Sequence, residues 1–335
     1  MNYIYILLKI ISLQYLIIIF HELIHFIMAK LLNLKTSLIY ILPFKFYKDN
    51  SRYKFSIVNL KEIFITSYQH FDSIEVKNNK DKDKLLKKLN LYLFSSTIFD
   101  LLVFITLFLI GITIPNLSYL ALLSLIHFSI ATINFFNSDG KYAIGSSEDD
   151  RISFVLLRYF TICGNTKVSL DTKNYITMYH KEISKEIVYN SFDVNDLWNF
   201  LNNLSFYESS LLSYLNNDIL FLDLSTIKFY DTLIKDYYKI KELDYRQIKK
   251  VSISLIFYLI YRNINNLEIN LKQSFIDEIL LNSKSHYFRN LYNYYYNEKM
   301  SDTNYLKNAN NISMPYSISK SYEDTILNIM KYKNL

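Results

Sequence analysis

Cysteine, glycine and proline are scarce in this chain, whose 335 residues include 1 Cys, 4 Gly and 3 Pro. The single cysteine, Cys163, excludes an internal disulfide framework and a thiolate-rich zinc site, so histidines and carboxylates would have to hold any structural metal. The scarcity of glycine and proline argues against turn-rich all-β folds and doubly wound α/β folds. We therefore expect a mostly α fold.

Hydrophobic residues make up 51% of the chain and aromatic residues 17%, enough for a membrane part and a separate globular part. We expect a membrane-embedded core in residues 1–145 and a second domain in residues 146–335. The excess of basic over acidic residues lies mostly before residue 141, where 14 Lys and Arg stand against 9 Asp and Glu, compared with 23 and 22 in the rest. A surplus of basic residues beside membrane segments does not indicate a nucleic-acid-binding face, so we expect no nucleic-acid partner.

The first membrane span is expected at residues 3–32, a continuous apolar stretch interrupted by few charges. As a helix rising about 1.5 Å per residue, it is long enough to cross a bilayer. A signal peptide is the alternative, but no small-residue cleavage site follows the apolar run.

Two further spans are expected at about 89–112 and 117–137, in a stretch that contains no Lys or Arg. A tight connection at Pro115 and Asn116 joins them. The loop between the first and second spans carries 12 Lys and Arg, whereas the other flanks carry almost none. The positive-inside rule therefore places this loop and everything after Asp139 in the cytoplasm, and the N-terminus outside. We expect an integral protein of a bacterial cell membrane, in contact with membrane lipid.

Three segments outside the spans are also informative. Residues 37–47 and 52–58 alternate apolar and polar side chains around a short polar turn, which predicts a small cytoplasmic β-hairpin. Residues 77–88 are interpreted as a charged linker. The second domain reads as soluble and all-α, and its longest apolar run, 251–261, is too short to span a membrane and predicts a buried core helix.

The sequence HELIH begins at His21 in the first span. In a helix, His21 and His25 lie on one face a turn apart, which lets both imidazoles reach one tetrahedral zinc ion. Glu22 lies beside them, where it can take a proton from zinc-bound water. The alternatives to a metal site are a coincidental match to this pattern and a polar cluster with a structural role. The apolar surroundings favour function, because ionisable groups inside a membrane are costly unless they have partners.

Two histidines leave the metal short of a third protein ligand. Asp139, at the end of the third span, is the best candidate, and Gly140 would allow the backbone to turn there. His127 and Asp100 are rival ligands. Either of these two can instead form a polar contact between helices.

Together, HELIHFIMAK in the first span, the hairpin-like segment, and a third span that ends in an Asn-containing stretch with Asp-Gly resemble the membrane core of site-2 proteases, over about residues 10–145. The resemblance implies Glu22 as the base and a Zn²⁺ ion held by His21, His25 and Asp139. It also implies that Asn134 helps to hold the substrate chain. Ser95, Ser96 and Thr97 stand where the family typically has Gly-Pro.

We therefore expect a three-helix transmembrane zinc metalloprotease core that hydrolyses a peptide bond in or near a transmembrane segment of a membrane protein or peptide. The strand-like edge in residues 37–58 would receive the unwound substrate as an added strand. The alternatives are a catalytically silent relative that binds a peptide or protein partner, and a membrane-anchored enzyme that trims soluble peptides.

Overall fold

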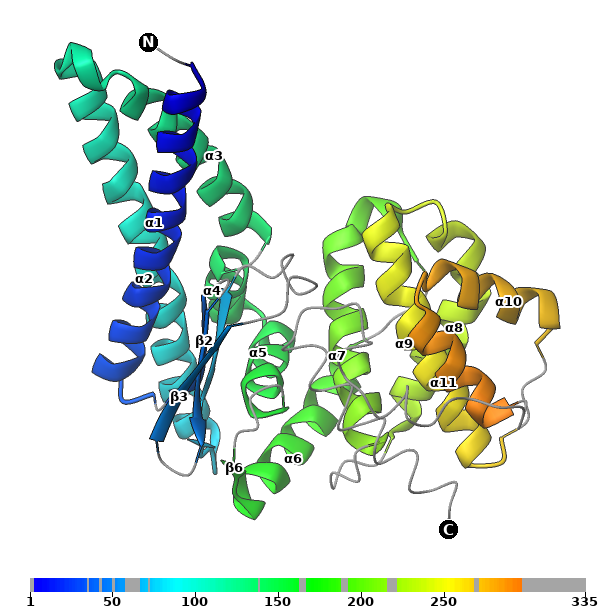
Figure 1. Ribbon diagram of the computed structural model, residues 1–335. Coiled ribbons are helices and arrows are strands. Elements are labelled where there is room, and N and C mark those ends of the chain that lie inside the picture. Colours follow the sequence, from blue (N-terminus) through cyan, green and yellow to red (C-terminus); the bar gives the residue numbers. More distant parts are fainter. Residues whose placement is uncertain are drawn as a thin grey trace. The chain divides into compact units, whose positions relative to one another are not determined.

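The computed structural model describes residues 3–34, 36–41, 44–49, 52–57, 67–71, 73–137, 139–162, 167–187, 192–215, 222–267 and 271–296 (Figure 1). The side chains of Asn134 and Asp139 are not among the described ones. The chain divides into two compact units, Met1–Val168 and Ser169–Leu335. The predicted division at residue 145 stays a prediction. The boundary between the compact units lies further along the sequence, because the two helices in residues 139–162 pack with the first unit.

The described part of the first unit is mostly helical, as predicted. Its helices are α1 (Tyr3–Leu31), α2 (Asn79–Thr113), the 3-10 helix Pro115–Leu117, α3 (Tyr119–Asn137), α4 (Asp139–Glu148) and α5 (Asp150–Ile162). Its strands are β1 (Thr36–Ile41), β2 (Phe44–Asp49), β3 (Arg52–Ile57), β4 (Ser67–Phe71), β5 (Ser73–Ile74) and β6 (Lys167–Val168). The short helix at Pro115 is the predicted tight connection.

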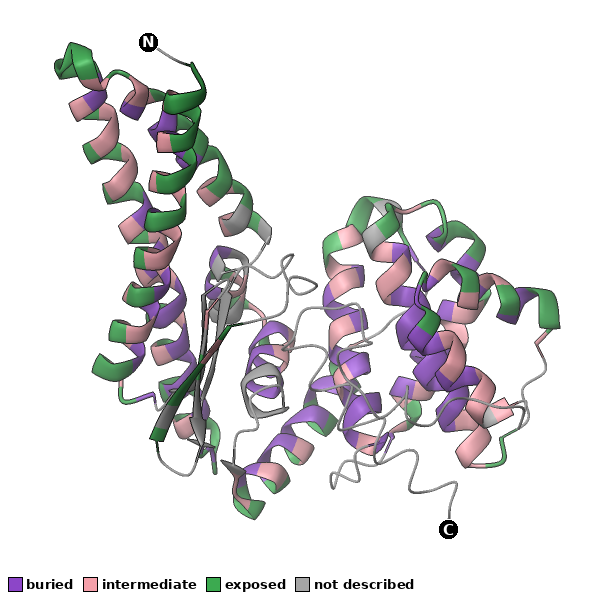
Figure 2. Cartoon of the chain, in the orientation of Figure 1, coloured by how far each residue is buried: buried purple, intermediate pink, exposed green. Residues whose placement is uncertain are grey.

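Two of these helices, α1 and α2, are long and apolar enough to cross a membrane. Much of the surface of α1 and α2 is exposed (Figure 2). The exposed large hydrophobic side chains include Leu8 in α1 and Leu102 in α2. Apolar surface that the protein leaves uncovered is expected of a helix that faces lipid. The third helix, α3, is apolar over the shorter range Tyr119–Ile133, and its crossing of the membrane stays a prediction.

The interpretation of residues 77–88 as a linker is wrong for most of its length, because α2 already begins at Asn79. The Asn78 side chain caps the helix by accepting from the Asp81 backbone N–H at 3.0 Å. Helical spacing then gives a buried stripe despite the many charges, formed by Lys82, Leu85, Leu86, Leu89, Tyr92, Leu93, Ser96 and Asp100. At about 1.5 Å per residue, α2 is longer than the roughly 30 Å hydrocarbon layer, so its charged start lies beyond the apolar region.

The helices α1, α2 and α3 pack together as a three-helix bundle. Their shared apolar cluster has Ile10 and Ile17 of α1 and Leu120 and Leu123 of α3 at its centre, with α2 side chains around them. At Gly111 the backbones of α2 and α3 approach so closely that a Cβ would overlap Ala121. Glycine is therefore required at this crossing.

The chain leaves α1 through Asn33, whose positive φ of 56° lies in the left-handed region that asparagine tolerates. Four strands then form an antiparallel sheet in the order β3, β2, β1, β4. The predicted hairpin corresponds to β2 and β3, with Asp49 opposite Arg52. The prediction of one strand over residues 37–47 is wrong, because that segment contributes both β1 and the start of β2. Both β1 and β4 contact α1, so the sheet lies beside the HELIH helix.

The described elements of the second unit are all helices, which fits the predicted all-α domain: α6 (Leu170–Glu186), the 3-10 helix Val194–Asp196, α7 (Leu197–Leu215), α8 (Leu224–Ile240), α9 (Tyr245–Ile264), α10 (Gln273–Asn282) and α11 (His286–Tyr296). The predicted core helix at 251–261 is confirmed, since α9 is buried over that whole range. Buried tyrosines fill much of this core, and Tyr230 hydrogen-bonds Ser254 of α9 at 2.7 Å.

Candidate metal centre

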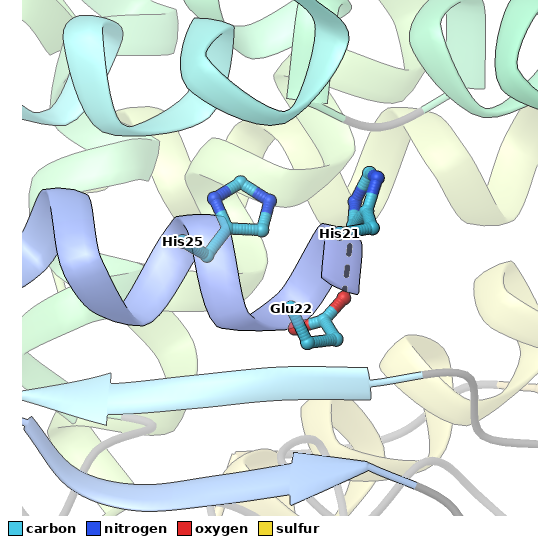
Figure 3. A group of neighbouring side chains, drawn as sticks. All are labelled: His21, Glu22 and His25. Carbon is cyan, nitrogen blue, oxygen red and sulfur yellow. Dashed lines mark ion pairs between the residues drawn. The ribbon is translucent and has the colours of Figure 1, made fainter. Parts of the chain in front are cut away.

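The HELIH turn of α1 brings three potential metal ligands together. His21, Glu22 and His25 each offer one ligand atom, and these atoms lie within 4.8 Å of one another. Glu22 and His25 are each 4% exposed, and His21 is half-buried. In Figure 3 the two imidazoles project from one side of α1, whereas Glu22 projects toward the strands of the sheet. The i and i+4 spacing thus gives the predicted arrangement of two histidines on one face.

The orientation of His25 is set by the neighbouring helix. Its Nδ1 lies 3.1 Å from the backbone carbonyl oxygen of Tyr92 in α2, and the two rings are 4.6 Å apart between centroids. A carbonyl oxygen only accepts, so Nδ1 carries the proton and donates. The lone pair for a metal is then on Nε2 of His25.

His21 is oriented by a carboxylate. Its Nδ1 lies 3.0 Å from both Oδ1 and Oδ2 of Asp100 in α2. Nδ1 must be the donor here as well, which places the lone pair on Nε2. That second nitrogen faces Glu22, with 3.8 Å between Nε2 and Oε1. The nitrogen that contacts Asp100 and the nitrogen that can bind a metal ion therefore lie at opposite edges of the His21 ring.

Asp100 and His127, the two rival ligands, meet each other behind His21. His127 Nε2 lies 3.4 Å from Asp100 Oδ1, and both side chains are buried. Both residues form polar contacts that join α1, α2 and α3, and their roles as rival ligands stay predictions. Neither belongs to the group of clustered ligand atoms found among the described residues.

Asp139 is the first residue of α4, and Asn134 lies in the last turns of α3. Their side chains lie outside the described part of the structure, so their roles as zinc ligand and substrate-binding residue stay predictions. The role given to Gly140 is wrong: it lies inside α4, and no described glycine has a positive φ. Glycine is needed there for space, because a Cβ would overlap the Phe135 ring.

This donor set fits a zinc ion. Histidines that bind zinc usually donate their other ring N–H to a carboxylate or a backbone carbonyl, which fixes the tautomer. His21 and His25 show one of each, through Asp100 and Tyr92. Two imidazoles beside a carboxylate in a buried site are the ligand chemistry that zinc prefers over calcium or magnesium.

Sequence reasoning missed two members of this site. The Tyr92 carbonyl carries no signal in the sequence, because every residue has one. Gln14, whose Nε2 lies 3.3 Å from His127 Nδ1, is a polar residue inside an apolar span, two helical turns before His21. The rule that polar groups inside a membrane have partners could have identified it.

Comparison with known proteins gives one match. A model of peptidase family M50, the site-2 protease family, matches residues 9–314, which is most of the chain. No curated protein and no solved structure matches. Peptidases of this family are membrane-embedded metallopeptidases and are generally zinc-dependent, in agreement with the apolar helices and the histidine pair described above. The chain belongs to peptidase family M50.

Proposed function

We propose that this protein is an intramembrane zinc endopeptidase that cleaves a peptide bond in or near a transmembrane segment, with His21, His25 and Asp139 as metal ligands and Glu22 as the general base. The observation that carries the proposal is the arrangement of the two imidazoles. Both Nδ1 atoms face acceptors in α2, so Nε2 is the metal-binding atom of each ring, and the ligand atoms of the two histidines lie within 4.8 Å of each other. A polar cluster with a purely structural role would not require both histidines to use the same ring nitrogen for their contacts with α2.

The chemistry follows from the positions of these side chains. Zinc, when bound, supplies Lewis-acid polarisation of a peptide carbonyl and lowers the pKa of water in the site. The Glu22 carboxylate accepts the proton of the attacking water at Oε1 and delivers it to the leaving amine. Burial of Glu22 keeps bulk water away from this transfer.

The substrate must reach the site as an extended chain, since a helix hides its peptide groups in its own hydrogen bonds. An unwound segment can pair with an edge strand of the sheet. Among the described strands, β1 and β2 each pair on both sides, so the edges are β3, inside the predicted range 37–58, and β4, outside it. We place the substrate along β4, because it contacts α1 and because Glu22 projects toward the strands (Figure 3). Orientation in the membrane, with the N-terminus outside, remains part of this proposal.

The decisive variant is Glu22→Gln, which keeps side-chain size but cannot accept the proton. We expect unchanged zinc content and a loss of cleavage by about 10²- to 10⁴-fold, the usual contribution of a general base. The full chain is reconstituted in phospholipid vesicles with a library of doubly tagged single-span peptides, and the products are measured by mass spectrometry. Glu148→Gln, an exposed carboxamide substitution at the end of α4, is the matched control and is expected to behave as wild type.

Two results would contradict the proposal. A Glu22→Gln protein that cleaves as fast as wild type removes the base from the mechanism. Zinc-loaded wild type that cleaves no member of the library supports the silent, peptide-binding relative instead.

A further inference from the structure

Behind the HELIH turn, three polar side chains from three different helices form a continuous chain of contacts to His21. Gln14 Nε2 of α1 lies 3.3 Å from His127 Nδ1 of α3. His127 Nε2 lies 3.4 Å from Asp100 Oδ1 of α2, and both Asp100 oxygens lie 3.0 Å from His21 Nδ1. Asp100 and His127 are buried, at 8% and 4% exposure.

The donor and acceptor roles along this chain are mutually consistent. The amide nitrogen of Gln14 donates, so His127 Nδ1 accepts and the proton of the neutral ring is on Nε2. That nitrogen lies at ion-pair distance from the Asp100 carboxylate, 3.4 Å from Oδ1, without the geometry of a hydrogen bond. His21 Nδ1 donates to the same carboxylate. The contact with Asp100 thus makes Nδ1 of His21 the donor, and Nε2, the nitrogen on the Glu22 side, is the atom that can bind a metal ion.

A buried carboxylate inside an apolar bundle is costly, and its cost must be offset by partners. A contact that only joined helices could use any donor on α1. Asp100 instead uses the nitrogen of His21 that zinc does not need, which is the arrangement that orients zinc-binding histidines in general.

We propose that Asp100 is the positioning residue of His21, and that His127 and Gln14 hold Asp100 in place. Asp100 fixes the His21 tautomer and ring orientation, and its negative charge makes His21 a stronger zinc ligand. This inference rests on the proposed zinc site but assigns a function to two residues that otherwise compete as third ligands.

The chain order predicts a graded series of effects. Asp100→Leu removes the acceptor of His21 and should weaken zinc binding by about 10- to 100-fold, the usual cost of losing such a partner. Asp100→Asn keeps one oxygen acceptor and should lose clearly less. His127→Leu leaves Asp100 in place without one of its supports, so its effect should be smaller than that of Asp100→Leu, and Gln14→Leu should have the smallest effect.

The experiment measures zinc affinity of the full chain in detergent, by competition with a chromogenic chelator. The visible spectrum of the Co²⁺-substituted protein reports the ligand geometry, and circular dichroism reports the fold. Ser124→Ala is the matched control, because Ser124 is also buried on α3 but donates to Ala121 O of its own helix at 2.7 Å. Its zinc affinity should equal that of wild type.

The outcomes separate this inference from the proposed function. Wild type that binds no zinc overturns both. If a folded Asp100→Leu protein binds zinc as tightly as wild type, the positioning role alone is wrong. If Asp100→Asn loses as much affinity as Asp100→Leu and changes the Co²⁺ spectrum equally, Asp100 is a metal ligand and the inference is wrong. Should the leucine variant fail to fold, Asp100→Asn and His127→Leu are compared with wild type instead. Zinc affinity equal to that of wild type in both variants overturns the positioning role.

Discussion

Two long apolar helices, α1 in the first unit and α9 in the second, differ in how far their apolar side chains are exposed. Leu8 of α1 is 56% exposed, whereas Leu255 of α9 is 0% exposed. The polar side chains differ too. The buried polar residues of α1 are Glu22 and His25 of the candidate metal centre, but those of α9 include Ser254, which bonds a core tyrosine.

This difference separates two physical uses of a hydrophobic helix. The apolar surface of α9 is removed from water by other helices of its own unit, so it stabilises the folded domain directly. The apolar surface of α1 is left for lipid, and the protein interior along α1 is used for costly ionisable groups. Hydrophobicity alone does not distinguish these cases; the covering of the helix by protein does.

The largest expected effect compares polar residues of the candidate metal centre, His25 of α1 and Asp139 of α4, with a buried polar residue of α9. His25→Ala and Asp139→Ala should each abolish the roughly one zinc per chain expected of a three-ligand catalytic site. Ser254→Ala should keep zinc and lower the free energy of unfolding by only about 0.5–1.5 kcal/mol, since one buried hydrogen bond is lost. Metal analysis after dialysis, with urea unfolding followed by Trp198 fluorescence, measures both quantities. Retention of zinc by Asp139→Ala would disprove its assignment as the third ligand.

A matched pair of leucine truncations tests the apolar surfaces. Leu255→Ala should cost about 2–5 kcal/mol in the free energy of unfolding, because it leaves a cavity in a packed core. Leu8→Ala should change stability by less than about 0.5 kcal/mol, as expected for an exposed position. Trp198, the single tryptophan, reports the second unit in urea, and circular dichroism during titration with SDS reports the first. Equal losses in the two variants would show that the outer face of α1 is covered by protein.

The smallest expected effect concerns a carboxylate beside a histidine in the second unit. Asp223 caps α8 by accepting from the Thr226 N–H at 2.9 Å, and its Oδ2 lies 3.8 Å from His180 Nδ1. Burial raises the pKa of Asp223, but hydrogen bonds from Thr226 and Ser184 and the nearby His180 outweigh it, so the pKa is lowered overall. A lowered pKa in the folded state stabilises the fold above the unfolded value of about 3.9, and this stabilisation is lost as the pH falls through the folded value.

Asp223→Ala should therefore destabilise the second unit by about 0.5–2 kcal/mol at pH 7, with a smaller difference from wild type near pH 3. Asp223→Asn should retain most of the cap at both pH values, because asparagine is an equally good capping residue. Urea midpoints followed by Trp198 fluorescence measure the effect. A loss of zinc in Asp223→Ala would contradict the distinction between these two carboxylates, since of the two it is Asp100 that contacts His21, a proposed metal ligand.

Local features of the sequence were sufficient for much of the fold and for the centre of the site. Helical spacing and an apolar run place His21 and His25 on one face of a span, and the short apolar run at 251–261 gives a buried helix. These inferences succeed because a helix has a fixed period and because imidazole and carboxylate chemistry do not depend on distant residues. The helix start at Asn79 was also readable from the Asn78 cap and the leucine spacing, although the many charges masked it.

Only the tertiary structure decided what the isolated polar residues of the spans do. Asp100 lies 79 residues from His21 in the sequence, and nothing local tells whether its carboxylate binds a metal, joins two helices or orients a histidine. The same holds for the Tyr92 carbonyl, which meets His25 only because α1 and α2 pack together. The sequence by itself determined which groups can do the chemistry, because that is a property of each side chain. The packing of α1 against α2 decided which nitrogen of each histidine hydrogen-bonds within the protein, because that depends on partners brought together only by the fold.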